Sequence, residues 1–175
     1  MIELPDGCYP LLLLSDSQLE ARCRIRAHTA SGPGGQKRNR SCSAVRIAHP
    51  PTGLSAIAAE SRLQGENRRR ALRRLRIKLA LQVRLRDGCP CLPKPLTETL
   101  SSGDLPRLNP RNPLFPLACA FVLDHLWVAG GRMADAARGL GVSSGQLNRF
   151  VSSDPDLFTA AQTIRRHFSL PPLRH

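Results

Sequence analysis

The chain is poor in aromatic residues and has no long hydrophobic run. Phe, Trp and Tyr together make up only 4% of its 175 residues, so nucleic-acid recognition by stacking bases on aromatic rings is not expected. Leu11 to Leu14 form a short apolar patch, and no basic segment precedes it. We therefore expect neither a signal peptide nor a membrane span, and we expect a cytoplasmic protein.

Residue patterns for metal binding and for a self-contained hydrolase are also missing. The six cysteines include no Cys-x-x-Cys pair, which argues against a zinc site or a disulfide framework. None of the five histidines lies in a local signature of a Ser-His-Asp or Cys-His site. We expect no metal and no cofactor, and the chain lacks a recognisable general base.

Acidic residues are scarce relative to basic ones. The chain has 26 Lys and Arg against 13 Asp and Glu, a formal net charge of +13, and its sequence pI is about 11.1. Such a charge favours a polyanionic partner, either nucleic acid or a membrane surface. Arg greatly outnumbers Lys, which suits bidentate phosphate contacts, although a codon bias toward Arg would give the same composition.

Period-2 alternation predicts a small antiparallel sheet in the first half of the chain. Residues 23–27 alternate between apolar and basic side chains, as in a strand with one wet face. Further strands are predicted over 44–48 and 54–59, joined by a Pro-Pro turn at 49–53. A short helix over residues 15–20, capped by Ser15 or Asp16, precedes the sheet.

A long basic helix is predicted from Glu66 to about Arg86. Leu72, Leu75, Leu79 and Val83 recur at helical spacing, and we expect this stripe to pack on the sheet. The other faces carry basic residues: Arg68, Arg69, Arg70, Arg73, Arg74, Arg76, Lys78, Arg84 and Arg86. A solvated charged face is the plain interpretation, but the shortage of acids favours contact with a polyanion.

The second half of the chain predicts a linker followed by a helical module. Residues 88–112 are rich in Pro, Gly and Ser without periodicity, which is typical of a semi-stiff linker. Within 113–175, residues 132–152 fit a helix-turn-helix template with Gly141 at the turn. The expected fold is α+β, with residues 1–87 forming a sheet-and-helix domain and 113–175 an all-helical module.

The hexapeptide Ser-Gly-Pro-Gly-Gly-Gln at residues 31–36 is the best candidate for chemistry. Hydrolysis of an ester passes through an oxyanion, and fixed backbone N–H donors aimed at it are among the largest catalytic contributions. Gly34 and Gly35 permit positive φ and a close approach of the backbone. Gln36 would then present its N–H to the reacting centre, and a polyanionic partner would supply the missing base.

Residues 10–87 resemble the catalytic domain of class I peptide-chain release factors. The resemblance is carried by 23–30, the hexapeptide, Asn39, 43–47, His49, 51–53 and the helix start at Gln64, Asn67 and Arg68. It implies a ribosome-dependent peptidyl-tRNA hydrolase, whose partners are the ribosomal peptidyl-transferase centre, rRNA and peptidyl-tRNA, with no membrane and a monomeric chain.

The resemblance also assigns roles to residues of the site. Gly34 and Gly35 would shape the loop, and Gln36 would stabilise the transition state through its N–H while its side chain admits water. The side-chain amide of Gln36 is a candidate for N5-methylation. The residues expected to contact RNA are Lys37, Arg38, Arg40, Arg68, Arg69, Arg73 and Arg76.

The chain departs from the family outside residues 10–87, and several functions are compatible with that departure. No decoding region with short Pro, Ser or Thr motifs is recognisable outside residues 10–87, so the chain is most similar to codon-independent hydrolases that rescue stalled ribosomes. Those proteins typically end in a Lys/Arg-rich tail, and here a helical module stands instead. The alternatives are a non-catalytic RNA- or DNA-binding regulator that uses the helix-turn-helix, or a module that docks a ribosomal protein.

Overall fold

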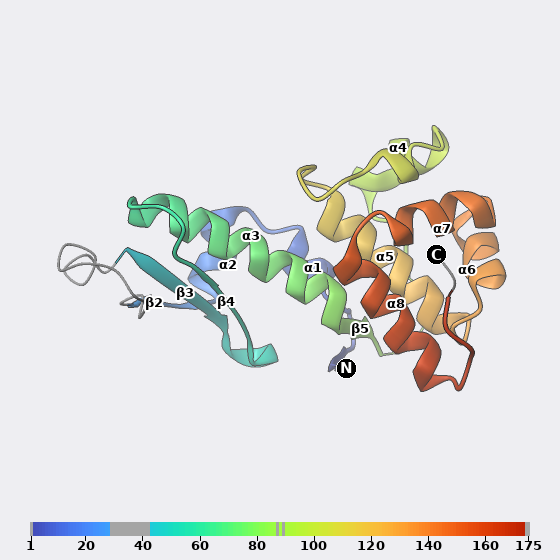
Figure 1. Ribbon diagram of the computed structural model, residues 1–175, viewed down its shortest axis with the longest axis horizontal. Helices are drawn as coiled ribbons and strands as arrows, with labels where there is room; N and C mark the ends of the chain where they lie inside the picture. The colour runs from blue at the N-terminus through green and yellow to red at the C-terminus, as the bar shows by residue number, and fades with distance from the viewer. Residues whose placement is uncertain (1, 29–42, 87, 89, 174–175) are drawn as a thin grey trace. The chain divides into compact units, whose positions relative to one another are not determined.

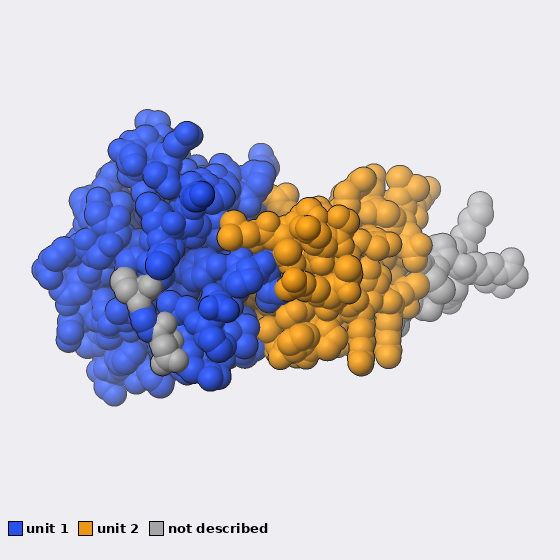
Figure 2. Space-filling model, turned by 180° about the vertical axis from the view of Figure 1, so that it is seen from behind, with its two compact units in different colours: residues 1–12, 80–175 blue, residues 13–79 orange. Residues whose placement is uncertain are grey.

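The computed structural model describes residues 2–28, 43–86, 88 and 90–173 (Figure 1). The chain divides into two compact units (Figure 2). Residues 13–79 form one, which we call the sheet unit, and residues 1–12 with 80–175 form the other, the helical unit. These bounds differ from the division predicted from the sequence, because the N-terminal residues pack with the second half of the chain.

The sheet unit contains the predicted antiparallel sheet. Strands β2 (Arg24–His28), β3 (Ala44–His49) and β4 (Leu54–Ala58) pair in that order, so β4 is an edge strand. Buried apolar side chains alternate along β3 and β4: Val45, Ile47, Ala56 and Ala58. Ala44 and His49, at the ends of β3, are also buried. Period-2 patterning therefore predicted this sheet correctly.

The short helix before the sheet begins where the sequence predicted. Helix α2 (Asp16–Ala21) is capped by Ser15, whose Oγ accepts the Gln18 N–H at 3.3 Å, while Gln18 Oε1 accepts the Ser15 N–H at 2.9 Å. This reciprocal pair satisfies two backbone donors that a helix start would leave unpaired. Leu19 on the inner face is fully buried.

The turn between β3 and β4 is built from a 3₁₀ helix, η1 (Pro50–Thr52), and Gly53 in the left-handed region with φ 69°. Inside it, His49 Nδ1 and Thr52 Oγ1 lie 2.9 Å apart, and both side chains are buried. Thr52 Oγ1 also donates to the His49 carbonyl at 3.4 Å. His49 therefore braces the turn.

Helix α3 (Gln64–Gln82) carries the predicted stripe, and Leu72, Leu75 and Leu79 are buried. Two of its basic side chains bond to the edge strand: Arg74 Nη1 to the Ile57 carbonyl at 2.7 Å and Lys78 Nζ to the Ser55 carbonyl at 2.8 Å. These bonds occupy carbonyls that an edge strand would otherwise leave open. The boundary between the two units falls inside α3, after Leu79.

The prediction that this helix continues to Arg86 is wrong. Residues Val83–Leu85 form strand β5, which pairs in parallel with β1 (Ile2–Leu4), so that Ile2 lies opposite Val83. Val83 fits the helical spacing of the leucines, which is why the periodicity ran past the true end. The pairing partner lies near the N-terminus, far away in the sequence, where no local pattern could reveal it.

Arg84, expected on the solvated face of that helix, is fully buried in the helical unit. Its Nη1 lies 3.0 Å from Asp124 Oδ1, and its Nη2 donates to the Ala80 carbonyl. The Asp124 carboxylate also accepts the Tyr9 hydroxyl at 2.7 Å and the Leu85 N–H at 3.2 Å. Burial raises the pKa of Asp124 against the opposing effect of the Arg84 charge.

The segment 88–112, expected to be a linker, contains short helices. These are η2 (Lys94–Leu96), α4 (Thr97–Ser101) and η3 (Leu105–Arg107). Leu96, Leu105 and Leu108 are buried, and η3 contacts helix α7. The segment therefore packs as part of the helical unit, because scattered leucines anchor it between the prolines.

The rest of the helical unit is all-helical, as predicted. After α1 (Tyr9–Leu12) its helices are α5 (Phe115–Val128), α6 (Met133–Leu140), α7 (Ser144–Ser152) and α8 (Pro155–His167). Helix α5 is central: every residue from Phe115 to Leu126 is buried. No helix in the described ranges is both long and apolar enough to cross a membrane. The fold is α+β.

Helices α5 and α6 approach closely at Gly139, where a Cβ atom would lie 2.9 Å from His125 Nδ1. The His125 ring is 7% exposed, packs edge-on against Phe121, and its Nε2 has no hydrogen-bond partner in the described part of the chain. Burial lowers the pKa of His125, because a charged imidazolium is costly to place there.

Candidate functional site

The candidate catalytic loop joins the two strands of the β2–β3 hairpin. The strands are in register from Arg24 opposite Ala48 to His28 opposite Ala44. Between them lie six of the predicted site residues: Gly34, Gly35, Gln36, Lys37, Arg38 and Arg40. All six are outside the described residues, so their roles remain predictions, and the structure gives the strands that precede and follow them.

Asn67 fixes the chain at the start of β3. Its side chain is fully buried, and its Nδ2 donates to the carbonyls of Ser43 at 2.7 Å and Ser61 at 2.8 Å. Its Oδ1 accepts the Ser61 N–H at 2.9 Å. Only the family resemblance pointed to Asn67, since a buried asparagine within a basic helix gives no local signal.

The four predicted RNA-contact residues on α3 have different surroundings. Arg68 forms an ion pair with Glu20, with Nε 2.8 Å from Oε1. Arg76 is only 14% exposed and binds Asp16 at 2.9 Å and the Leu14 carbonyl at 2.7 Å. The other two, Arg69 and Arg73, are exposed. Arg68 and Arg76 therefore attach α2 to α3, and contact of all four with RNA stays a prediction.

Two buried histidines are expected to make the stability of the chain depend on pH. The pKa of His49 is lowered by burial and by the charge of Arg22, and that of His125 is lowered by burial. The unfolded chain, with histidine pKa near 6.5, binds protons that the folded chain resists. Above about pH 6.5 the two histidines do not reduce the free energy of unfolding. Below it, the free energy of unfolding is expected to fall as the pH drops toward the lowered pKa values of the folded chain.

Thermal unfolding at pH 7.5, 6.5 and 5.5 would measure this effect. We expect the melting temperature of the wild type to fall over this range, and that of His49→Gln/His125→Gln to change less. A double variant with the same slope as the wild type would show that other groups cause the dependence.

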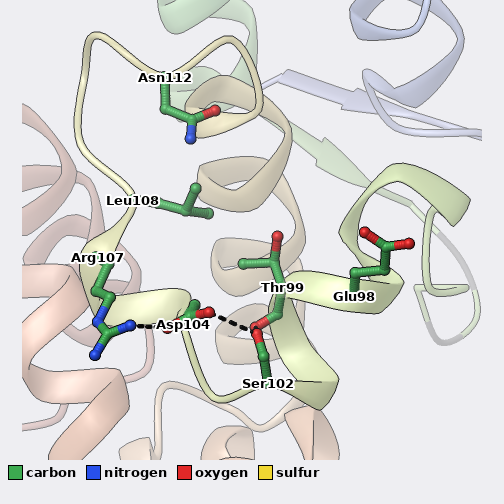
Figure 3. A pocket seen from close by; sticks show the side chains of 7 residues that line it. All are labelled: Glu98, Thr99, Ser102, Asp104, Arg107, Leu108 and Asn112. Carbon is green, nitrogen blue, oxygen red and sulfur yellow. Dashed lines mark hydrogen bonds and ion pairs between the residues drawn. The ribbon is translucent and has the colours of Figure 1, made fainter.

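A shallow hollow in the helical unit is not a good candidate for a binding site. Its lining residues are Glu98, Thr99, Ser102, Asp104, Arg107, Leu108 and Asn112 (Figure 3). Asp104 accepts bonds from Ser102 at 2.8 Å and from Arg107 at 2.7 Å, so three of the lining side chains bond to one another. The described residues also contain no cluster of His, Cys, Asp or Glu that could hold a metal ion.

Comparison with known proteins shows that the segment containing β2, β3, β4 and α3 is similar to a known domain. Residues 17–88 match the family model described as the RF-1 domain. Peptide chain release factor 2 of Paramagnetospirillum magneticum is 48% identical over 60 residues, which are 34% of this chain and 16% of that protein. Peptide chain release factor 1 of Ureaplasma parvum is 54% identical over 56 residues, 32% of this chain and 16% of that protein.

The similarity is therefore high but local. Peptide chain release factor 1 of Acidiphilium cryptum adds 48% identity over 65 residues, 37% of this chain and 18% of that protein. The chain thus spans less than a fifth of the length of these relatives. No solved structure gives a significant match to the chain.

Proposed function

We propose, from the match of residues 17–88 to the RF-1 domain, that the protein hydrolyses the ester bond of peptidyl-tRNA on the ribosome. One observation carries the proposal. Gly34-Gly35-Gln36 lies between β2 and β3 of this domain, and the relatives that share the domain are named peptide chain release factors.

The chemistry would be divided between protein and RNA. The chain would bring the Gln36 N–H to the oxyanion of the tetrahedral intermediate, which fixed donors stabilise strongly. Gly34 and Gly35 would let the backbone approach the ester, and the Gln36 side chain, a candidate for N5-methylation, would admit water. The terminal tRNA ribose and rRNA would complete the site, which explains why the sequence offers no general base.

We further propose that release is codon-independent and serves ribosome rescue, in the cytoplasm and by a monomer. The support is that the similarity is confined to residues 17–88 and that no decoding motif is recognisable elsewhere in the sequence. The described part of the chain beyond α3 packs as a helical unit instead. Recognition of the stalled state would then not involve reading bases in the mRNA.

Peptide release from three ribosome complexes tests codon independence. The complexes carry the same peptidyl-tRNA and present a stop codon, a sense codon or no mRNA in the decoding site. We expect release on all three, with rates for stop and sense codons within about threefold, roughly 0.7 kcal/mol in activation free energy. Release confined to the stop codon would contradict the rescue function and leave the hydrolase proposal standing.

A second candidate function rests on the helical unit. Helix α6 ends at Gly141 in the left-handed region, with φ 68°, and α7 begins with a capping box between Ser143 and Gln146. This arrangement is compatible with a helix-turn-helix, whose second helix enters the DNA major groove. Strongly salt-dependent binding of the full chain to duplex DNA, without peptide release, would favour a non-catalytic regulator.

A further inference from the structure

Two arginines face each other on the exposed side of the sheet. Arg26 of β2 lies directly opposite Arg46 of β3, and Arg24 lies two residues before Arg26, on the same face of the strand. All three side chains are exposed. Directly opposed residues in an antiparallel pair have Cβ atoms about 5 Å apart, where like charges destabilise the sheet.

Acidic side chains do not offset this repulsion. Within the described ranges, no ion pair involves Arg24, Arg26 or Arg46. The segment 29–42 contains no Asp or Glu in its sequence. By contrast, four other arginines of the same unit each have a carboxylate partner: Arg68 pairs with Glu20, Arg70 with Glu66, Arg74 with Glu60 and Arg76 with Asp16.

Ser55 on the edge strand accepts bonds from two cations, one through its side chain on this face and one through its backbone carbonyl at the edge of the sheet. Its Oγ accepts from Arg46 Nη2 at 3.2 Å, and its carbonyl accepts from Lys78 Nζ at 2.8 Å. Both acceptors are neutral oxygens, so they do not neutralise the positive charges of Arg46 and Lys78. A guanidinium has five N–H donors and an ammonium three, and one bond each leaves donors for another acceptor.

We propose that Arg24, Arg26 and Arg46, which we name the arginine face, bind the phosphate backbone of RNA. The proposal rests on the proposed function for the identity of the RNA, which would be ribosomal. Paired guanidiniums suit phosphate oxygens because they offer several donors in a fixed fork. The repulsion between Arg26 and Arg46 would be relieved once a phosphate lies between them.

The composition of the face favours RNA over a membrane surface. Protein segments that lie in a membrane interface insert apolar or aromatic side chains alongside their basic residues. The large apolar side chain on this side of the sheet is Ile57, opposite Arg46 and 45% exposed. The next pair of opposed residues on this face of β3 and β4 is Ala48 and Ser55, which are both small.

The test is binding of the full-length Arg26→Gln/Arg46→Gln variant to purified ribosomal RNA, measured between about 50 and 200 mM salt. We expect affinity to fall roughly tenfold for each arginine, and the salt slope to fall by about 1 for each phosphate that is no longer bound. The matched control is Arg107→Gln, which removes one charge from an arginine that is 84% exposed in the helical unit and is expected to change the affinity less than about twofold.

Thermal unfolding separates binding from a structural role. Because the double variant removes like-charge repulsion, we expect its melting temperature to equal or exceed that of the wild type. RNA affinity and salt slope equal to those of the wild type would overturn the proposal. So would tighter binding of the wild type to phosphatidylglycerol vesicles than to RNA, with the double variant losing that binding.

The outcome does not depend on hydrolysis. If the wild type releases no peptide yet the double variant loses RNA affinity, the proposed function fails and the arginine face stands. If Gln36→Ala lacks release while the double variant binds RNA as the wild type does, the arginine face fails and the proposed function stands.

Discussion

Replacing Asp124 with alanine is expected to destabilise the helical unit by about 3–5 kcal/mol, the cost of breaking a buried ion pair from one side. The variant leaves the Arg84 guanidinium fully buried without its carboxylate. It also removes the acceptor of the Tyr9 hydroxyl and of the Leu85 N–H. A loss of this size is a large fraction of the roughly 5–15 kcal/mol typical of a folded domain.

Urea unfolding followed by circular dichroism measures the effect. The matched control is Asp104→Ala, which breaks an ion pair with Arg107 in which the side chains are 42% and 84% exposed, and it is expected to cost no more than about 1 kcal/mol. If Asp124→Ala itself does not fold, Arg84→Met/Asp124→Leu removes both charges and is expected to recover most of the stability. Equal costs for Asp124→Ala and Asp104→Ala would contradict a stabilising role for the buried pair.

Gly35→Ala is expected to lower the rate of peptide release about 10²- to 10³-fold, the usual cost of losing one oxyanion donor. A Cβ at this position restricts φ and stands where the proposed backbone approaches the ester. Binding to the ribosome is expected to persist, because no charge changes. Single-turnover release at saturating protein separates the two quantities.

Gly65→Ala is the matched control for this substitution. Gly65 lies in the first turn of α3, and a Cβ there would meet nothing within 4 Å. The same chemical change is therefore expected to leave the release rate unaltered and to stabilise the helix slightly. If Gly35→Ala releases peptide as fast as Gly65→Ala, the loop does not act through its backbone.

The sequence predicted those parts of the fold whose signals are local. Strands β2 to β4, the Ser15 cap and the leucine stripe of α3 follow from periodicity and capping chemistry within short segments. Strand β5 and the burial of Arg84 did not follow, because they depend on partners at Ile2–Leu4 and Asp124. A residue that looks charged and solvated locally can be fully buried when its partner lies on a distant part of the chain.

The candidate site also has features that the local sequence predicts and features that it does not. The resemblance to release factors was recognisable because the pattern of residues is short and ordered, and residues 17–88 match the RF-1 domain. The roles of Gly34, Gly35 and Gln36 stay predictions. The contacts among the described elements of this unit were not predictable: Asn67 reaches Ser43 from a helix, and Arg68 and Arg76 bind carboxylates of α2. Sequence spacing within α3 shows which residues share a face, but not which have partners on other elements.

We propose that Gly34-Gly35-Gln36 promotes hydrolysis of peptidyl-tRNA on the ribosome. Single-turnover peptide release from stalled ribosomes, at saturating wild-type protein and saturating Gln36→Ala, tests it most directly. We predict release by the wild type, with a rate at least about tenfold lower for the variant while its ribosome binding is unchanged, about 1.4 kcal/mol or more in activation free energy. Equal rates for the two proteins, or no release by the wild type, would contradict it.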